Sequence, residues 1–221
     1  MTERARQRMS PRRLILLRHG ETQANLDGIW QGHLDVALTA LGHQQAAAAG
    51  AALTANKPVR IVASDLQRAA DTAAAVGRQL DVEVRLDSRW REFDVGQWTG
   101  LRSAEVIAMH PAERSAALRG EEQRRGIDGE GPAQVRERVA PALEELIDGL
   151  AAGECAIVVS HGGTIRILTA VLLGLDSPTI TRLLTTPGNC QWAELVEGTD
   201  GWRLAGWNLR APDLGGGASS G

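Results

Sequence analysis

The chain of 221 residues has few or none of several residue types, and each shortage excludes a class of protein. Its two cysteines, Cys155 and Cys190, form neither a disulfide framework nor a zinc site, so a cytoplasmic location is expected. No stretch approaches the roughly 20 apolar residues that a membrane span requires. The basic N-terminus is not followed by the apolar core of a signal peptide. A membrane partner is therefore not expected.

Basic charge is carried almost entirely by arginine, because Lys57 is the only lysine. Arginine suits bidentate phosphate recognition, although codon choice in a GC-rich genome explains the bias more simply. The net charge of -3 implies no polyanion-binding surface, so nucleic acid is not an expected partner. We expect one domain over residues 13–210 between disordered tails at 1–12 and 211–221. A homodimer is one assembly compatible with the sequence.

Short apolar strands alternate along the chain with helices. Apolar runs predict strands, and apolar residues at helical spacing predict helices. Strands are predicted at 13–17, 59–63, 82–86 and 156–159, and helices at 41–53, 66–80, 133–150 and 164–173. This alternation is typical of α/β proteins. It predicts a three-layer α/β/α sandwich around a mainly parallel central sheet.

Local signals refine these elements. Ser64-Asp65 is expected to cap the helix over 66–80. Pro141 is expected to bend or restart the helix over 133–150. Alternating residues on either side of Thr199-Asp200-Gly201 predict a closing hairpin.

Two predicted strands end in the same dipeptide, His-Gly. Arg18-His19-Gly20-Glu21 follows the apolar run 14–17, and His161-Gly162-Gly163 follows the run 155–160. Ligand sites of parallel sheets form outside the carboxyl ends of the strands. A histidine there can be a nucleophile, and an adjacent arginine can hold an anion. Glycine at these positions lets backbone approach a ligand closely and, at a helix start, presents N–H groups to an anion.

Arg68 and Glu92 are two further candidates. Arg68 lies one helical turn after Asp65. If it does not bind a ligand, it is expected on a solvated helix face or in an ion pair with Asp65 or Asp71. Glu92 lies in the segment 90–98 with two tryptophans and the only phenylalanine. Large aromatic neighbours can raise the pKa of a carboxyl by desolvation, as a general acid requires. The alternative is that Glu92 is an ordinary acidic residue of a loop, without a catalytic role.

Other chemistries are less favoured. The chain has no Gly-x-Gly-x-x-Gly at a helix start, no P-loop and no Gly-x-Ser-x-Gly. His19 and His161 could join Asp65 or Glu92 on a metal. However, no ligands are paired at metal-binding spacing, and nearby arginines would repel a cation. No metal or other cofactor is therefore expected.

Four segments, taken in order, resemble the motifs of the histidine phosphatase superfamily, the phosphoglycerate mutase-like proteins. They are Arg18-His19-Gly20-Glu21-Thr22 with Asn25, Ser64-Asp65-Leu66-Gln67-Arg68-Ala69, Glu92 with Gly96, Trp98 and Gly100, and Ser160-His161-Gly162-Gly163. The match spans most of the chain. Each motif is modest alone, but four in order are highly specific.

The resemblance implies a role for each motif. His19 would attack phosphorus and carry the phosphoryl group. Arg18, Arg68 and His161 would bind its oxygens. Glu92 would protonate the leaving oxygen and then deprotonate the attacking water. The other positions expected around the phosphate of a small ester substrate are Thr22, Asn25, Gln31, Gly32 and Gly162.

The phosphatase branch of the family is favoured over the mutases. Family mutases have a longer segment after the acid loop and a tyrosine in that loop, whereas this chain has no tyrosine. The closing stretch 202–208 resembles actinobacterial members. A catalytically silent binding module is a further alternative. It is disfavoured because all five expected catalytic residues are retained.

The segment 101–134 is expected to form the outer wall of the pocket. Within it, Arg124-Arg125 resembles the arginine pair with which family mutases bind a carboxylate. The charge run 121–125 is nevertheless more typical of a solvated loop, and we interpret it so.

Overall fold

The computed structural model of the protein describes residues 10–212. Most of both predicted tails, residues 1–9 and 213–221, lies outside the described residues. Arg12 belongs to the predicted N-terminal tail, yet its guanidinium donates to the carboxylate of Glu197 and to the carbonyl oxygen of Ile147. These contacts hold the chain in place just before the first strand.

Within residues 10–212, six strands form one mixed sheet in the order β3-β2-β4-β1-β5-β6. They are β1 (Arg13–Arg18), β2 (Arg60–Ala63), β3 (Val84–Leu86), β4 (Cys155–Ser160), β5 (Trp192–Gly198) and β6 (Gly201–Leu209). The first four are parallel, and β5 and β6 form an antiparallel hairpin beside β1. The mainly parallel sheet and the closing hairpin are therefore confirmed.

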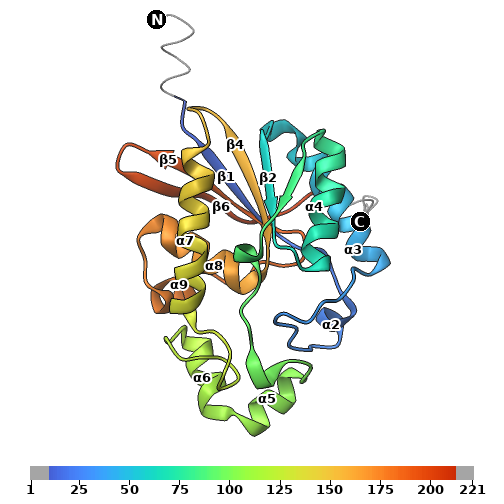
Figure 1. The fold of residues 1–221 in the computed structure, drawn as a ribbon, viewed down its shortest axis with the longest axis vertical. Coiled ribbons are helices and arrows are strands. Elements are labelled where there is room, and N and C mark those ends of the chain that lie inside the picture. The colour runs from blue at the N-terminus through green and yellow to red at the C-terminus, as the bar shows by residue number, and fades with distance from the viewer. Residues whose placement is uncertain (1–9, 213–221) are drawn as a thin grey trace, which may run out of the picture.

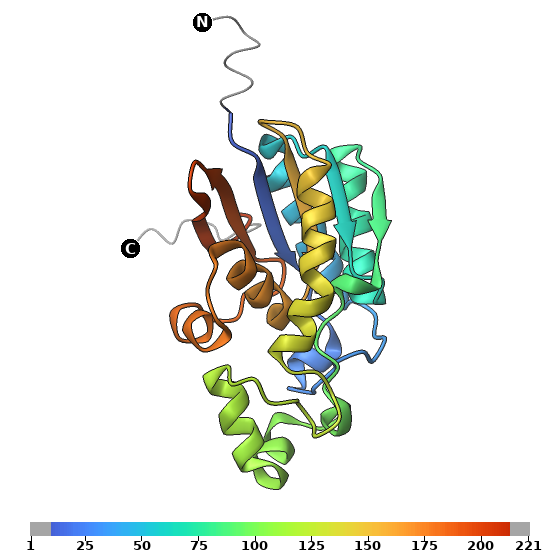
Figure 2. The same ribbon diagram turned by 60° about the vertical axis from the view of Figure 1, so that its left-hand side comes forward.

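Helices cover both faces of the sheet, as Figures 1 and 2 show. One face carries α3 (Ala40–Leu53) and α4 (Gln67–Leu80), and the other carries α7 (Pro132–Asp148) and α8 (Gly162–Leu173). In β1, Leu14 and Leu16 pack with α7 and α8, and Ile15 and Leu17 pack with α3 and α4. The continuous apolar run arises because both faces are buried. The predicted three-layer sandwich is confirmed.

Shorter elements gather beyond the carboxyl ends of the parallel strands (Figure 1). They are α2 (Gln23–Leu26), α5 (Ser103–Met109) and α6 (Pro111–Arg119); α9 (Ser177–Leu183) follows α8. Single turns at Thr54–Asn56, Ser88–Trp90 and Gly96–Trp98 complete the fold. None of the helices between residues 10 and 212 combines the length and apolar character that a membrane crossing requires.

Two local features differ from expectation. Of the two outcomes expected at Pro141, a bend or a restart, the restart is wrong, because α7 continues through the proline and its buried residues on both sides pack into one core cluster. Asp65 does not cap α4, because its carboxylate binds the guanidinium of Arg91. Asp35, from a distant loop, instead accepts a hydrogen bond from the first N–H of α4, at Gln67.

Candidate active site

The two His-Gly strand ends lie side by side because β1 and β4 are adjacent parallel strands. Arg18 pairs in register with Ser160, so the next residues, His19 and His161, leave the sheet together. Their ring centroids are 5.1 Å apart, and both side chains are buried. The convergence expected from the sequence is therefore present at the carboxyl end of the sheet.

His19 is held as a neutral imidazole with a defined tautomer. Its Nδ1 lies 2.7 Å from the carbonyl oxygen of Gly20, and a carbonyl only accepts, so Nδ1 carries the proton. Burial lowers the pKa of His19 well below its usual value, and the charges of Arg18 and Arg68 lower it further. Nε2 is thus left with a lone pair at neutral pH.

Arg18 and Arg68 bring two guanidinium groups to His19, and neither forms an ion pair with an acidic residue between 10 and 212. Arg68 is 1% exposed, and its two terminal nitrogens donate to the carbonyl oxygens of Leu34 and Gly32 at 2.8 Å. Arg18 donates to Pro187. The Nε of each is buried without a partner in the described residues. Burial lowers the pKa of Arg68 to about 10, while Glu92 and Asp35 oppose the shift.

His161 begins α8 and has one ring nitrogen without a partner. Its Nε2 lies 2.9 Å from the hydroxyl oxygen of Ser64, at the end of the neighbouring β2. Its Nδ1 is buried and makes no hydrogen bond among residues 10–212. Burial lowers the pKa of His161 well below its usual value, followed by the charge of Arg68. A second neutral imidazole therefore faces the first.

A cavity of about 230 Å³ opens at His19. Its walls include seven residues expected from the sequence: Arg18, His19, Asn25, Gln31, Gly32, Arg68 and Glu92. His161 and Gly162 do not line it but lie behind His19 at the start of α8. Thr22 is buried beneath Asn25 and caps α2, and its hydroxyl also lies 3.2 Å from the side-chain oxygen of Gln31.

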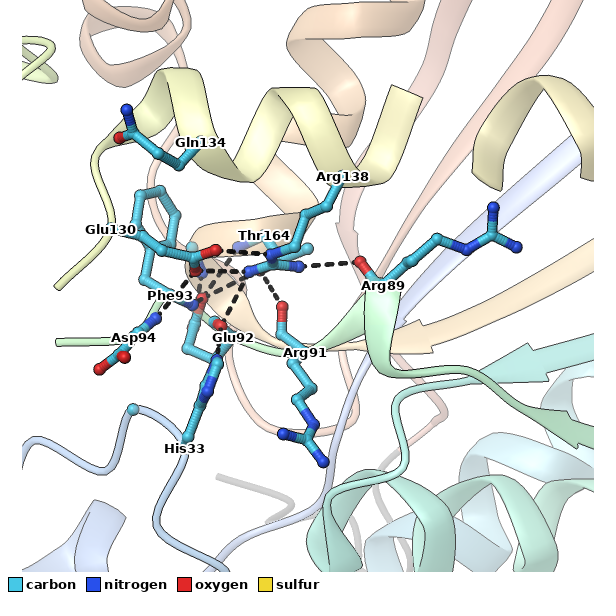
Figure 3. Close-up of polar contacts among 12 residues, drawn as sticks. His33, Arg89, Arg91, Glu92, Phe93, Asp94, Glu130, Gln134, Arg138 and Thr164 are labelled. Atoms are coloured by element: carbon cyan, nitrogen blue, oxygen red, sulfur yellow. Dashed lines mark hydrogen bonds and ion pairs between the residues drawn. The ribbon is translucent and has the colours of Figure 1, made fainter. Parts of the chain in front are cut away.

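Glu92 approaches the amino end of α8, as Figure 3 shows. Its Oε1 accepts from the backbone N–H groups of Phe93 and Thr164 and from the Thr164 hydroxyl, and its Oε2 accepts from Gly163. The anion at this helix start is therefore a side chain of the protein itself. The aromatic residues near Glu92 in sequence, Trp90, Phe93 and Trp98, are buried in the core, and the ring of Phe93 and Oε1 of Glu92 both lie next to Gly163.

A second network holds the backbone of the Glu92 loop (Figure 3). Arg138 of α7 donates to the carbonyl oxygens of Arg89 and Glu92 and forms a two-point ion pair with Glu130. His33 contacts the same carbonyl oxygen of Glu92 at 2.8 Å. Glu130 in turn accepts from the backbone N–H of Asp94. The acid loop is thus fixed from α7.

Sequence patterns missed Asn189, and they gave Arg125 the wrong surroundings. Asn189 donates to the carbonyl oxygen of His19 and to the side-chain oxygen of Asn25. The Pro187-Gly188-Asn189 turn signal could have marked this loop, although not its partner. Arg125 is not a solvated loop residue. It lines the cavity, and its guanidinium carbon lies 3.5 Å from the ring centroid of Phe93.

Gly20 serves packing more than ligand approach. A Cβ at Gly20 would lie 2.5 Å from the carbonyl oxygen of Gly42, in the first turn of α3. The glycine pair lets the loop after β1 rest on α3, which fixes the backbone of His19.

Among residues 10–212, no three histidine, cysteine or acidic side chains are grouped as metal ligands would be.

Comparison with known proteins agrees with this geometry. The profile of the histidine phosphatase superfamily (branch 1) matches residues 14–210. The glucosyl-3-phosphoglycerate phosphatase of Mycolicibacterium vanbaalenii is 40% identical over 220 residues, covering 92% of this chain and 97% of that protein. A probable phosphoglycerate mutase of Salmonella arizonae is less similar, with 31% identity over 194 residues, 88% of this chain and 89% of that protein.

A solved structure of mycobacterial glucosyl-3-phosphoglycerate phosphatase, in complex with VO3, superposes with a TM-score of 0.82 at 37% identity. The match covers 89% of this chain and 99% of that one. These similarities support a phosphatase over a mutase. The chain belongs to the histidine phosphatase superfamily, as its four motifs predicted.

Proposed function

We propose that the protein hydrolyses small phosphomonoesters through a phosphohistidine on His19. One observation carries the proposal. Three buried nitrogens, the Nε of Arg18, the Nε of Arg68 and the Nδ1 of His161, have no partner in the described residues and lie around a neutral His19. Nδ1 of His161 carries the proton when Nε2 accepts from the hydroxyl of Ser64. Such a set of donors without a counter-ion suits a phosphoryl group, whose charge is spread over three oxygens.

In the first step, Nε2 of His19 attacks phosphorus, and the bond from phosphorus to the ester oxygen breaks. Glu92 gives its proton to the departing oxygen, which leaves as an alcohol. Oε2 is the better placed oxygen to carry that proton, since it accepts only the Gly163 hydrogen bond within residues 10–212. Arg18, Arg68 and His161 stabilise the charge on the three equatorial oxygens.

In the second step, Glu92 takes a proton from a water molecule, and the water oxygen attacks phosphorus. The nitrogen–phosphorus bond breaks, inorganic phosphate leaves and His19 recovers its lone pair. The hydrogen bond from Nδ1 to Gly20 keeps Nε2 directed at phosphorus in both steps. The roles of Asn25, Gln31, Gly32, Thr22 and Gly162 around the phosphate remain predictions, as do a cytoplasmic location and a homodimer.

We propose glucosyl-3-phosphoglycerate, or a phosphoglycerate ester like it, as the natural substrate. The support is the activity for which the relatives are named, together with coverage of nearly their whole length. The mutase alternative keeps some support from the probable mutase at 31% identity. Conversion of 3- to 2-phosphoglycerate at a rate comparable to hydrolysis would establish it instead.

The test uses p-nitrophenyl phosphate and glucosyl-3-phosphoglycerate with the purified full chain. The wild type should release phosphate from both, EDTA should not inhibit, and vanadate should compete with the substrate. His19→Ala should abolish turnover, whereas His43→Ala, a histidine of α3 outside the site, should not. Full activity of His19→Ala, or strong inhibition by EDTA, would refute the mechanism.

A further inference from the structure

The loop of residues 31–35 fixes the position of Arg68. Its carbonyl oxygens at Gly32 and Leu34 accept from the two terminal nitrogens of Arg68, each at 2.8 Å. Asp35 accepts from the first N–H of α4, the helix that carries Arg68. Because this side chain and its helix are both bound to the loop, the loop and Arg68 form one structural unit.

His33 lies between those two carbonyl groups in the sequence, and its side chain reaches the acid loop. Nε2 of His33 is 2.8 Å from the carbonyl oxygen of Glu92, and a carbonyl only accepts, so Nε2 carries the proton. Arg138 donates to the same oxygen at 2.9 Å. Figure 3 shows the two donors approaching from different sides, His33 from its loop and Arg138 from α7. A carbonyl oxygen has two lone pairs, and both are used here.

His33 differs from Arg138 in what else it holds. Arg138 also forms a two-point ion pair with Glu130. The half-buried His33 forms no ion pair with an acidic residue in the described part of the chain. Its hydrogen bond thus connects the loop at 31–35 directly with Glu92. A substitution at His33 should therefore release the backbone of Glu92 with a smaller loss of stability than one at Arg138.

The connection matters because the general acid and the phosphate-binding groups act on one substrate at the same time. In phosphoryl transfer, the attacking and leaving atoms are roughly in line with phosphorus. Arg68 binds the phosphoryl oxygens in the proposed mechanism, while Glu92 must lie within hydrogen-bond reach of the leaving oxygen. A displacement of about 1 Å can lower the rate about 100-fold. Catalysis therefore requires that Glu92 stay at a fixed distance from Arg68.

We propose that His33 is a positioning residue, which holds the general acid Glu92 in place relative to Arg68 through the loop 31–35. This rests on the proposed function, in which Glu92 protonates the leaving oxygen. The role of His33 is therefore greatest for esters whose alcohol leaves poorly, because only these depend on a well-placed proton. A residue that merely stabilised the fold would affect good and poor leaving groups equally.

The experiment compares kcat/KM for phenyl phosphate and 2,4-dinitrophenyl phosphate in each protein. The two esters share one ring, but dinitrophenolate leaves readily without a proton and phenolate does not. The value of kcat/KM contains only the steps up to the phosphohistidine, whereas kcat also contains the attack of water, for which Glu92 is the base. Because the ratio compares two esters on one protein, a loss of folded protein does not change it.

His33→Leu should lower kcat/KM for phenyl phosphate about tenfold, as the loss of one hydrogen bond does, and should lower that for 2,4-dinitrophenyl phosphate much less. His33→Gln keeps a side-chain N–H of similar reach and should retain most of the wild-type ratio. His43→Leu, exposed on α3, is the matched control and should leave the ratio unchanged. In a Glu92→Gln background, His33→Leu should have little further effect, since no acid remains to be positioned.

Three results would overturn the role of His33 while hydrolysis stands. They are an equal loss on both esters in His33→Leu, an unchanged kcat/KM for phenyl phosphate in that variant, and the same loss from His33→Leu in the Glu92→Gln background. Failure of the wild type to hydrolyse either ester would instead refute the proposed function, and the role of His33 with it.

Discussion

The carboxylate of Glu92 accepts a hydrogen bond from the backbone N–H of Thr164 at 3.1 Å. The single hydroxyl proton of Thr164 is shared between the carbonyl oxygen of Arg91 at 2.8 Å and the carboxylate of Glu92 at 3.2 Å. Thr164 therefore connects the first turn of α8 to both the backbone and the side chain of the acid loop. This contact fixes the proposed general acid relative to His161, which begins the same helix.

Thr164→Val should lower kcat about tenfold, because it removes a hydrogen bond to a charged group and loosens Glu92. KM should change little, since Thr164 does not line the cavity. Thr164→Ser keeps the hydroxyl and should retain most of the wild-type rate. Steady-state kinetics with p-nitrophenyl phosphate measures both variants. In a Glu92→Gln background the valine substitution should have little further effect, and full additivity of the two losses would contradict the coupling.

Gly163→Ala should lower activity by displacing the acid. A Cβ at Gly163 would lie 2.7 Å from Oε1 of Glu92 and 2.9 Å from the ring of the buried Phe93, so both side chains must move. Alanine is the better helix former, by roughly 1 kcal/mol, and this gain offsets part of the cost of moving the ring. We expect kcat to fall about tenfold or more and the melting temperature to fall slightly. A variant with normal kcat would show that the position of Glu92 does not limit the reaction.

Much of the fold and part of the site could be predicted from local sequence. In β1 and β4, unbroken apolar runs reflect burial on both faces. The two His-Gly ends then meet because parallel strands place their carboxyl ends together. Gly163 was expected to present an N–H to an anion, and it does so, although to Glu92. Short sequence patterns are sufficient to predict a structural feature when residues close in the sequence determine that feature.

Contacts between distant segments could not be predicted in this way. The cap of α4 comes from Asp35, and the contact on His19 comes from Asn189, 170 residues away. Arg125 occurs in a charge run that is typical of solvent-exposed loops, yet the fold places it on Phe93. Tertiary packing determines which residue contacts which in each of these cases. The local sequence of neither segment indicates its contact partner.

The two buried histidines should make stability depend on pH. Burial is the main reason that the pKa of His19 and of His161 is lowered well below 6.5. As pH falls below about 6.5, the unfolded chain therefore binds protons that the folded chain does not, and folding becomes less favourable. The loss should approach about 1.4 kcal/mol per pH unit for each histidine.

Urea unfolding of the wild type and of His161→Gln, between pH 7.5 and about 5.5, measures this slope above the range where most carboxylates titrate. The variant should lose about half of the slope that the two histidines cause, even if its stability is lower throughout. His110→Gln is the control, because that histidine is only half-buried, at the start of α6. Parallel slopes for all three proteins would show that the buried histidines do not control the pH response.

Arg138→Met should destabilise the protein by roughly 3 kcal/mol, since it leaves Glu130 partly buried without its ion pair and the carbonyl oxygens of Arg89 and Glu92 without a donor. It should also lower kcat, because the loop that bears Glu92 is released from α7. Arg89→Met is the matched control. Its pairs with Asp87 and Glu145 are both partly exposed to solvent, so the loss should be about 1 kcal/mol or less. Urea unfolding gives the stabilities and p-nitrophenyl phosphate gives the rates. Equal effects of the two variants on both measurements would mean that the ion pair of Arg138 contributes no more than a surface ion pair. In that case other contacts would have to hold the acid loop.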